Sequence, residues 1–342
     1  PFIRTIVNEK LKRMVHRDRS HPSLVIFNLI NEFGGRLSQD KELVAKRMND
    51  MREAHAVDPS RIMTFTSGWA GSEDKEEDSK AHMLPFDTTL YRKGWHDNHR
   101  AGGPETWVEN YYKGPKDNIM YTGNRTEVFL RGEEGAISTP PRIQLINDEV
   151  ERTGKTGWDG LFWKSQYKAF TDYFQKKGLA SHFGTLDDLT RSMANVSFEH
   201  QGRRIEGMRM QNLGDAYMVN GWEAIPYDNH SGIVDIYRNP KGDASILAYY
   251  NQPLYVAVAS RNQVVKLPGS AIVDFYIVNE KNLKGNHTLE IKVIAPDGKV
   301  VYTRNETVSI EGGETFGQLL LENVEVPVNG KEGTYRILAD IK

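Results

Sequence analysis

The sequence of 342 residues has no cysteine, no strong excess of either charge and no long apolar run. The missing thiol excludes disulfides, thiolate metal sites, iron–sulfur clusters and cysteine nucleophiles. A formal net charge of -2 provides no broad positive field, which argues against nucleic acid as a partner. No apolar stretch approaches the roughly 20 residues that span a bilayer, so we expect no membrane span. The length fits a large enzyme core or two ordinary domains.

Tryptophan is also missing from residues 259–342, and this region has a pattern of its own. Its runs AIVDFYIVN (271–279) and HTLEIKVIAP (287–296) alternate apolar and polar residues with the period of a half-buried strand. Asp297 and Gly298 then give a tight-turn signal before another such run. We therefore predict that 259–342 forms an all-β, immunoglobulin-like sandwich.

The first two thirds of the chain alternate short apolar strands with helical patterns, which is typical of α/β proteins. The predicted helices are 4–18, 38–55 and 161–213, the last with an interruption near Gly184. The predicted strands are 24–31, 61–68, 86–91, 126–135 and 216–223. Since helices or long loops separate these strands, we predict an α/β architecture for this part of the chain.

Carboxylates directly follow two of the predicted strands. Asn31-Glu32 comes at the end of the apolar run LVIFNLI, and Glu133-Glu134 follows TEVFLRG. Two carboxylates at strand ends of one barrel can face each other across a substrate, which is the arrangement that glycoside hydrolysis requires. The alternative is that each glutamate forms a surface salt bridge, but this explains a single site better than it explains both together.

Three separated segments of the chain carry motifs in a recognisable order. They are HPSLVIFNLINEFGG (21–35), RGEEGA (131–136) and AYMVNGWEAIPYDNHSGIVDIYRNPK (216–241). These segments resemble two motifs and the last-strand segment of glycoside hydrolase family 2, the β-galactosidase, β-glucuronidase and β-mannosidase group. The resemblance implies that 1–258 is the C-terminal portion of a TIM (β/α)8 barrel, strands four to eight, and that 259–342 is a following sandwich domain.

The resemblance also implies roles for single residues. Glu32 takes the place of the general acid/base, and Asn31 would hydrogen-bond the 2-hydroxyl of the sugar. Glu133 aligns with the nucleophile, whereas Glu134 stands where the family usually has Phe or Tyr, which leaves open which glutamate attacks. Trp222 matches the aromatic floor under the reacting sugar, and the alternative is an ordinary core tryptophan. The implied reaction is double displacement with retention, without cofactor or metal.

The Gly- and His-rich segment 94–107 is predicted to be a loop that lines the substrate site. We expect sugar contacts from Trp95, His96, Asp97 and His99, and a hydrogen bond to the nucleophile from Tyr91. Two alternatives stay open for this segment. One is a metal-dependent hydrolase centred on His96 and His99, and the other is simple loop packing.

The resulting hypothesis is an exo-acting retaining β-glycosidase. β-Galactosidase is the preferred specificity, and β-glucuronidase or β-mannosidase are the alternatives. A non-catalytic carbohydrate-binding or scaffold protein on the same fold is the competing class. We expect an oligosaccharide or glycoside as the ligand. A barrel needs eight strands and the sequence supplies five, so we also expect the N-terminal remainder of the same polypeptide as a partner; a homo-oligomer is compatible with the sequence.

Overall fold

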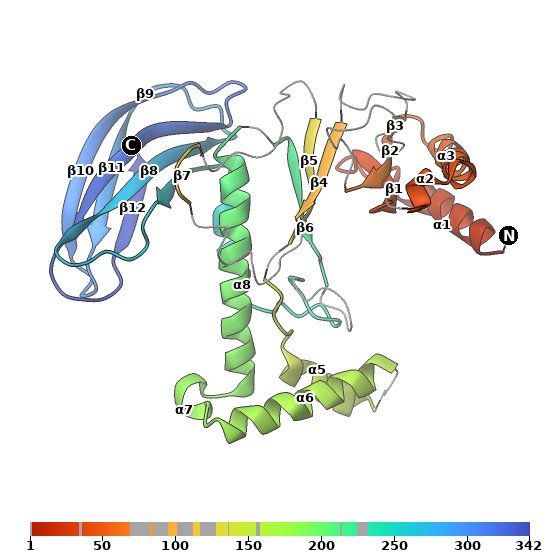
Figure 1. Cartoon of the computed structure of the whole chain (residues 1–342), viewed down its shortest axis with the longest axis horizontal. Helices are drawn as coiled ribbons and strands as arrows, with labels where there is room; N and C mark the ends of the chain where they lie inside the picture. Colours follow the sequence, from red (N-terminus) through yellow and green to blue (C-terminus); the bar gives the residue numbers. More distant parts are fainter. Residues whose placement is uncertain are drawn as a thin grey trace. The chain divides into compact units, whose positions relative to one another are not determined.

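The computed structural model describes residues 2–33, 36–68, 83–84, 95–100, 112–116, 128–135, 137–154, 158–212, 214–223 and 232–342 (Figure 1). The chain divides into two compact units that alternate along the sequence. The first unit comprises Pro1–Arg100, Thr122–Glu134 and Gly214–Val219. The second unit comprises Ala101–Tyr121, Gly135–Leu213 and Asn220–Lys342. The predicted domains 1–258 and 259–342 stay a prediction.

The N-terminal part of the first unit is a small sheet with helices packed against it. The sheet contains β1 (Ile26–Asn31), β2 (Ile62–Ser67) and β3 (Met83–Leu84), in that order. The helices are α1 (Phe2–Asp18), α2 (Arg36–Gln39) and α3 (Lys41–His55). β1 and β2 run parallel, and their last residues, Asn31 and Ser67, are register partners. The fully buried side chains of Val15, Met51 and Phe65 belong to one core cluster between helices and sheet.

A second sheet, which lies almost entirely in the first unit, has the order β4-β5-β6. It contains β4 (Trp95–Arg100), β5 (Val128–Gly135) and β6 (Ala216–Asn220). β4 and β5 are parallel. The prediction of a loop over 94–107 is wrong for 95–100: WHDNHR lacks the apolar alternation that marks a strand, and pairing with β5 sets its conformation. The predicted strand 86–91 lies outside the described residues.

The second unit carries the longer helices. They are α5 (Ile143–Thr153), α6 (Trp158–Lys176), α7 (Ala180–Phe183), α8 (Leu186–Arg209) and α9 (Ala244–Tyr250). The predicted interruption near Gly184 is confirmed, because Gly184 has a φ of 78° and Thr185 caps α8 by accepting from the Asp188 amide at 3.0 Å. Among the helices in the described ranges, none has the length and apolar character that a membrane crossing requires.

The C-terminal part of the second unit is a β-sandwich of two three-stranded antiparallel sheets, β11-β8-β7 and β10-β9-β12 (Figure 1). Its strands are β7 (Leu254–Ser260), β8 (Gly269–Asn279), β9 (Gly285–Ile294), β10 (Val300–Ile310), β11 (Gly317–Val328) and β12 (Arg336–Ile341). Both sheets contribute to one apolar core, in which Val273, Phe275 and Ile291 are fully buried. This bears out the predicted strands 271–279 and 287–296.

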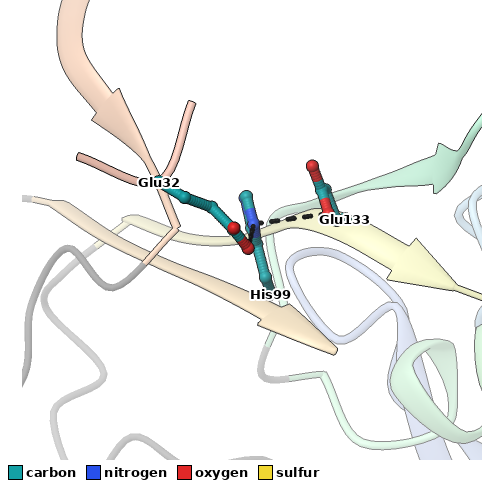
Figure 2. Close-up of side chains that lie close together, drawn as sticks. All are labelled: Glu32, His99 and Glu133. Atoms are coloured by element: carbon teal, nitrogen blue, oxygen red, sulfur yellow. Dashed lines mark hydrogen bonds and ion pairs between the residues drawn. The ribbon is translucent and has the colours of Figure 1, made fainter. Parts of the chain in front are cut away.

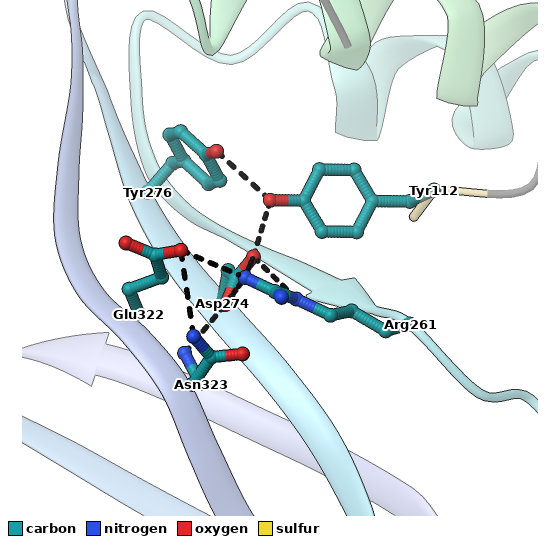
Figure 3. A network of polar contacts seen from close by, with 6 residues as sticks. All are labelled: Tyr112, Arg261, Asp274, Tyr276, Glu322 and Asn323. Atoms are coloured by element: carbon teal, nitrogen blue, oxygen red, sulfur yellow. Dashed lines mark hydrogen bonds and ion pairs between the residues drawn. The ribbon is translucent and has the colours of Figure 1, made fainter. Parts of the chain in front are cut away.

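A buried carboxylate, Asp274 on β8, organises the outer side of this sandwich (Figure 3). Arg261 donates to it through Nε at 3.0 Å and through Nη2 at 2.7 and 3.0 Å. The backbone N–H of Asn323 donates at 2.7 Å, and the hydroxyl of Tyr112 donates as well. Burial, followed by the hydrogen bond to Asp274, raises the pKa of Tyr112, so this hydroxyl stays protonated as a donor at physiological pH.

Candidate active site

Glu32 follows β1 in a backbone conformation that is rare for residues other than glycine. Its φ is 51°, and its N–H donates to the carbonyl oxygen of Ser67 at 2.8 Å. The next residue, Phe33, is buried edge-on against Phe65 and donates its N–H to Thr66 Oγ1 at 3.0 Å. A left-handed conformation costs about 1–2 kcal/mol for a residue with a side chain. The contacts of the Glu32 backbone and of Phe33 offset this cost and stabilise the conformation.

Glu133 and His99 reach Glu32 from two neighbouring parallel strands. They are register partners on β5 and β4, and their side chains lie on the same side of the sheet (Figure 2). His99 Nδ1 lies 3.0 Å from Glu32 Oε1 and 3.5 Å from Glu133 Oε2. One imidazole nitrogen therefore faces two carboxylates that are 101 positions apart in the sequence, as 133 − 32 = 101.

The strand end of β2 fixes the His99 ring from its other side. His99 Nε2 lies 2.7 Å from Ser67 Oγ, and the histidine side chain is only 3% exposed. Gly68 follows with a φ of 78°, and a Cβ at this position would lie 2.6 Å from the imidazole ring. Glycine is therefore required here both by the backbone conformation and by the close approach of the ring.

The separation of the two carboxylates decides what they can do. One oxygen of Glu32 and one of Glu133 lie within 4.8 Å of each other, and the side chains are 38% and 23% exposed. Retaining glycosidases hold their carboxyl groups about 5–5.5 Å apart, whereas inverting enzymes need roughly 6.5–9.5 Å to admit a water. This approach of two oxygens is nearer to the retaining than to the inverting separation, and both side chains are partly exposed.

The other predicted site residues are described less completely. Asn31 is the exposed last residue of β1, directly before Glu32. Trp222 comes two residues after the end of β6 and belongs to the second unit. Its side chain is 60% exposed, so it is not a core tryptophan. The backbones of Trp95, His96 and Asp97 belong to β4 and that of Glu134 to β5, but their side chains lie outside the described part of the structure, as does Tyr91 entirely.

Sequence reasoning did not identify Ser67 and Gly68 as site residues. The available signal was the same as for Glu32, namely small polar residues at the C-terminal end of a buried strand, in RIMTFTSG (61–68). Of the predicted residues, the structure brings together Glu32, His99 and Glu133.

Residues 1–121 match the family model described as glycosyl hydrolases family 2, TIM barrel domain. This part of the chain, about a third of its length, is therefore similar to glycosyl hydrolase family 2. The predicted fold class is confirmed: an α/β part that matches a TIM barrel domain over residues 1–121 is followed by an all-β domain. The immunoglobulin-like character of the sandwich stays a prediction. No curated protein matches the chain by sequence.

Two solved structures resemble the whole chain in fold. The exo-chitosanase of Amycolatopsis orientalis aligns with a TM-score of 0.50 at 14% identity, over 98% of this chain and 37% of that protein. The β-D-mannosidase from Dictyoglomus thermophilum aligns with a TM-score of 0.51 at 15% identity, over 99% of this chain and 36% of that protein. The chain thus spans little more than a third of either protein, and at these identities the likeness concerns the fold alone.

Proposed function

We propose that this protein is a retaining β-glycosidase that removes terminal β-linked sugars from oligosaccharides. The observation that carries the proposal is the approach of the Glu32 and Glu133 carboxylates to within 4.8 Å at the ends of strands β1 and β5. The match of residues 1–121 to a family model of glycosyl hydrolases supports the same activity. Double displacement is the reaction that this spacing favours.

In the first step, a Glu133 oxygen attacks the anomeric carbon while the bond to the leaving oxygen breaks. Glu32 donates its proton to that leaving oxygen, and the sugar becomes covalently attached to Glu133. In the second step, Glu32 accepts a proton from water, the water oxygen attacks the anomeric carbon, and the bond to Glu133 breaks. The burial of the His99 ring favours a positioning role for this residue between the two carboxylates.

For the substrate, we propose a β-galactoside first, with β-glucuronides and β-mannosides as alternatives. Asn31 is placed next to Glu32 in the chain, which supports a hydrogen bond from its amide to the sugar 2-hydroxyl. The exposure of the Trp222 indole supports a stacking surface for a pyranose ring. The further sugar contacts that we propose involve Tyr91, Trp95, His96 and Asp97.

A panel of nitrophenyl β-glycosides, applied to the full-length protein, tests this function. We expect turnover of at least one member, and a loss of kcat/KM of about 10²-fold or more in Glu32→Gln, the scale of a missing general acid. The matched control is Glu325→Gln, which makes the same change at an exposed position of β11 and should retain activity. If no glycoside is cleaved while Glu32→Gln and Glu133→Gln bind glycan like the wild type, the protein is a carbohydrate-binding scaffold and the proposal is wrong.

A further inference from the structure

The three side chains that meet near the strand ends also offer a metal ion three ligand atoms. Glu32, His99 and Glu133 each present one ligand atom, and these atoms all lie within 4.8 Å of one another. We propose that they form an inhibitory binding site for a zinc-type divalent transition ion. The inhibition rests on the proposed function, because the ion occupies the proposed catalytic pair, whereas the metal binding does not depend on it.

The spacing of the ligand atoms is close to that of a tetrahedral site. With metal–ligand bonds of about 2.0–2.1 Å, two ligand atoms of a tetrahedron lie about 3.3 Å apart. His99 Nδ1 lies 3.0 Å from the Glu32 oxygen and 3.5 Å from the Glu133 oxygen. The two carboxylates need to approach each other further, and rotation of the partly exposed glutamate side chains supplies this movement.

The surroundings of His99 are those of a metal-binding histidine. Such a histidine usually bonds a polar group through its second ring nitrogen, which fixes the ring and its tautomer. Ser67 Oγ occupies this position, 2.7 Å from His99 Nε2. A hydroxyl can accept as well as donate, so Ser67 can accept from a protonated Nε2 and leave the lone pair of Nδ1 directed at the ion. The close contact with Gly68 keeps the ring in this orientation.

The ligand types select the ion. One imidazole nitrogen with two carboxylate oxygens is a set that zinc accepts, with a fourth position left for water. Magnesium and calcium instead prefer oxygen ligands throughout, and the imidazole nitrogen of His99 suits them poorly. A bound zinc ion would engage the carboxylate oxygens with which Glu133 attacks and Glu32 carries its proton. Zinc and glycoside are therefore expected to compete.

Calorimetric titration of the full-length protein with zinc chloride tests the site directly. We expect one ion per chain, with the zinc affinity about 10–100-fold weaker in Ser67→Ala, the scale of a lost outer-shell partner, and weaker still in His99→Ala. Glu32→Gln keeps the shape of the side chain and should also weaken binding. His182→Ala removes an exposed histidine on α7 and is the matched control. Unchanged zinc binding in both His99→Ala and Glu32→Gln overturns the site.

Kinetics separate this proposal from the function on which its inhibition rests. On any nitrophenyl glycoside that is cleaved, we expect zinc to inhibit competitively, a chelator to restore the rate, and magnesium at the same concentration to have no effect. Zinc that raises the rate overturns the inhibitory role and favours a metal-dependent hydrolase. If no glycoside is cleaved, the proposed function fails, and the titration alone decides whether the metal site exists.

Discussion

Carboxylates occupy two different environments in the two units of this protein. In the second unit, Asp274 is fully buried and accepts from Arg261, Tyr112 and the Asn323 backbone (Figure 3). In the first unit, Glu32 and Glu133 remain 38% and 23% exposed and approach one shared imidazole nitrogen (Figure 2). The first carboxylate is closed off from solvent, whereas the second pair remains partly accessible to it.

This difference associates Asp274 with stability, and Glu32 and Glu133 with chemistry. A buried carboxylate that is paired and hydrogen-bonded is costly to disturb, because removing one partner leaves the other charge without compensation. Partly exposed carboxylates at strand ends contribute little to stability, but they can exchange protons and bonds with a substrate. We therefore expect mutations of Glu32 or Glu133 to lower activity with little loss of stability. Mutations around Asp274 should lower stability instead.

The largest effect is expected for Glu133→Gln. Removing the proposed nucleophile should lower kcat/KM by roughly 10³-fold or more, equivalent to about 4 kcal/mol of transition-state stabilisation. The free energy of unfolding should stay within about 0.5 kcal/mol of the wild-type value, since the side chain is partly exposed. Steady-state kinetics and urea unfolding measure both quantities. If Glu133→Gln keeps its activity, or loses stability instead, the two regions do not differ in the way that we propose.

Asp274→Asn is expected to have the reverse effect. The substitution keeps the shape of the side chain but removes the negative charge to which Arg261 and Tyr112 donate. Breaking a buried ion pair lowers the free energy of unfolding by about 3–5 kcal/mol. We expect the lower end of this range, because the Arg261 side chain is 22% exposed and also contacts Glu322 at 3.1 Å. Urea unfolding measures the loss. The exposed Asp340 on β12 is the matched control, and Asp340→Asn should change stability by less than about 0.5 kcal/mol.

Gly68→Ala tests the link between β2 and the His99 ring. The new Cβ would lie 2.6 Å from the imidazole, so we expect both a backbone penalty of about 1–2 kcal/mol and a displaced ring that lowers kcat. Gly298 has a similar φ of 83° with no atom within 4 Å of the added Cβ. Gly298→Ala should therefore show the backbone penalty in urea unfolding without the kinetic loss. Equal kinetics in the two variants would show that ring position is unimportant.

The smallest effect is expected for Tyr112→Phe, which removes a single donor to Asp274. The carboxylate keeps Arg261 and the Asn323 backbone, so the stability loss should be about 1 kcal/mol, that of one hydrogen bond. Thermal unfolding compares this variant with Tyr173→Phe, which changes an exposed tyrosine on α6 and should have almost no effect. A loss above that of Asp274→Asn would mean that Tyr112 contributes mainly through packing.

The parts of the fold that follow from local pattern could be predicted from the sequence, and the parts that follow from pairing could not. Alternation identified β8, β9 and β10 of the sandwich but not β7, and apolar runs identified β1, β2 and β5 together with the glutamates after two of them. β4 has no such pattern, because its pairing with β5 supplies what its sequence lacks. α5 was missed although Ile143, Ile146 and Val150 are buried at helical spacing.

The same limit applies to the polar sites. Their positions after two predicted strands, together with the resemblance to a family, indicated that Glu32 and Glu133 belong together; their separation in the sequence did not. The contacts of His99 with Ser67 and Gly68 depend on which strands are neighbours, and the sequence does not specify this. Asp274 is visible as a polar residue inside an apolar run, but its partner Tyr112 lies 162 positions away.

The anomeric configuration of the first product is the most direct test of the paired-carboxylate mechanism. Proton NMR of the full-length protein with a cleaved β-glycoside should show the β-anomer of the sugar appearing first, with the α-anomer growing only as the product mutarotates. This result is expected if Glu133 attacks and Glu32 completes a second displacement. An α-anomer that appears first would demonstrate inversion and contradict the account.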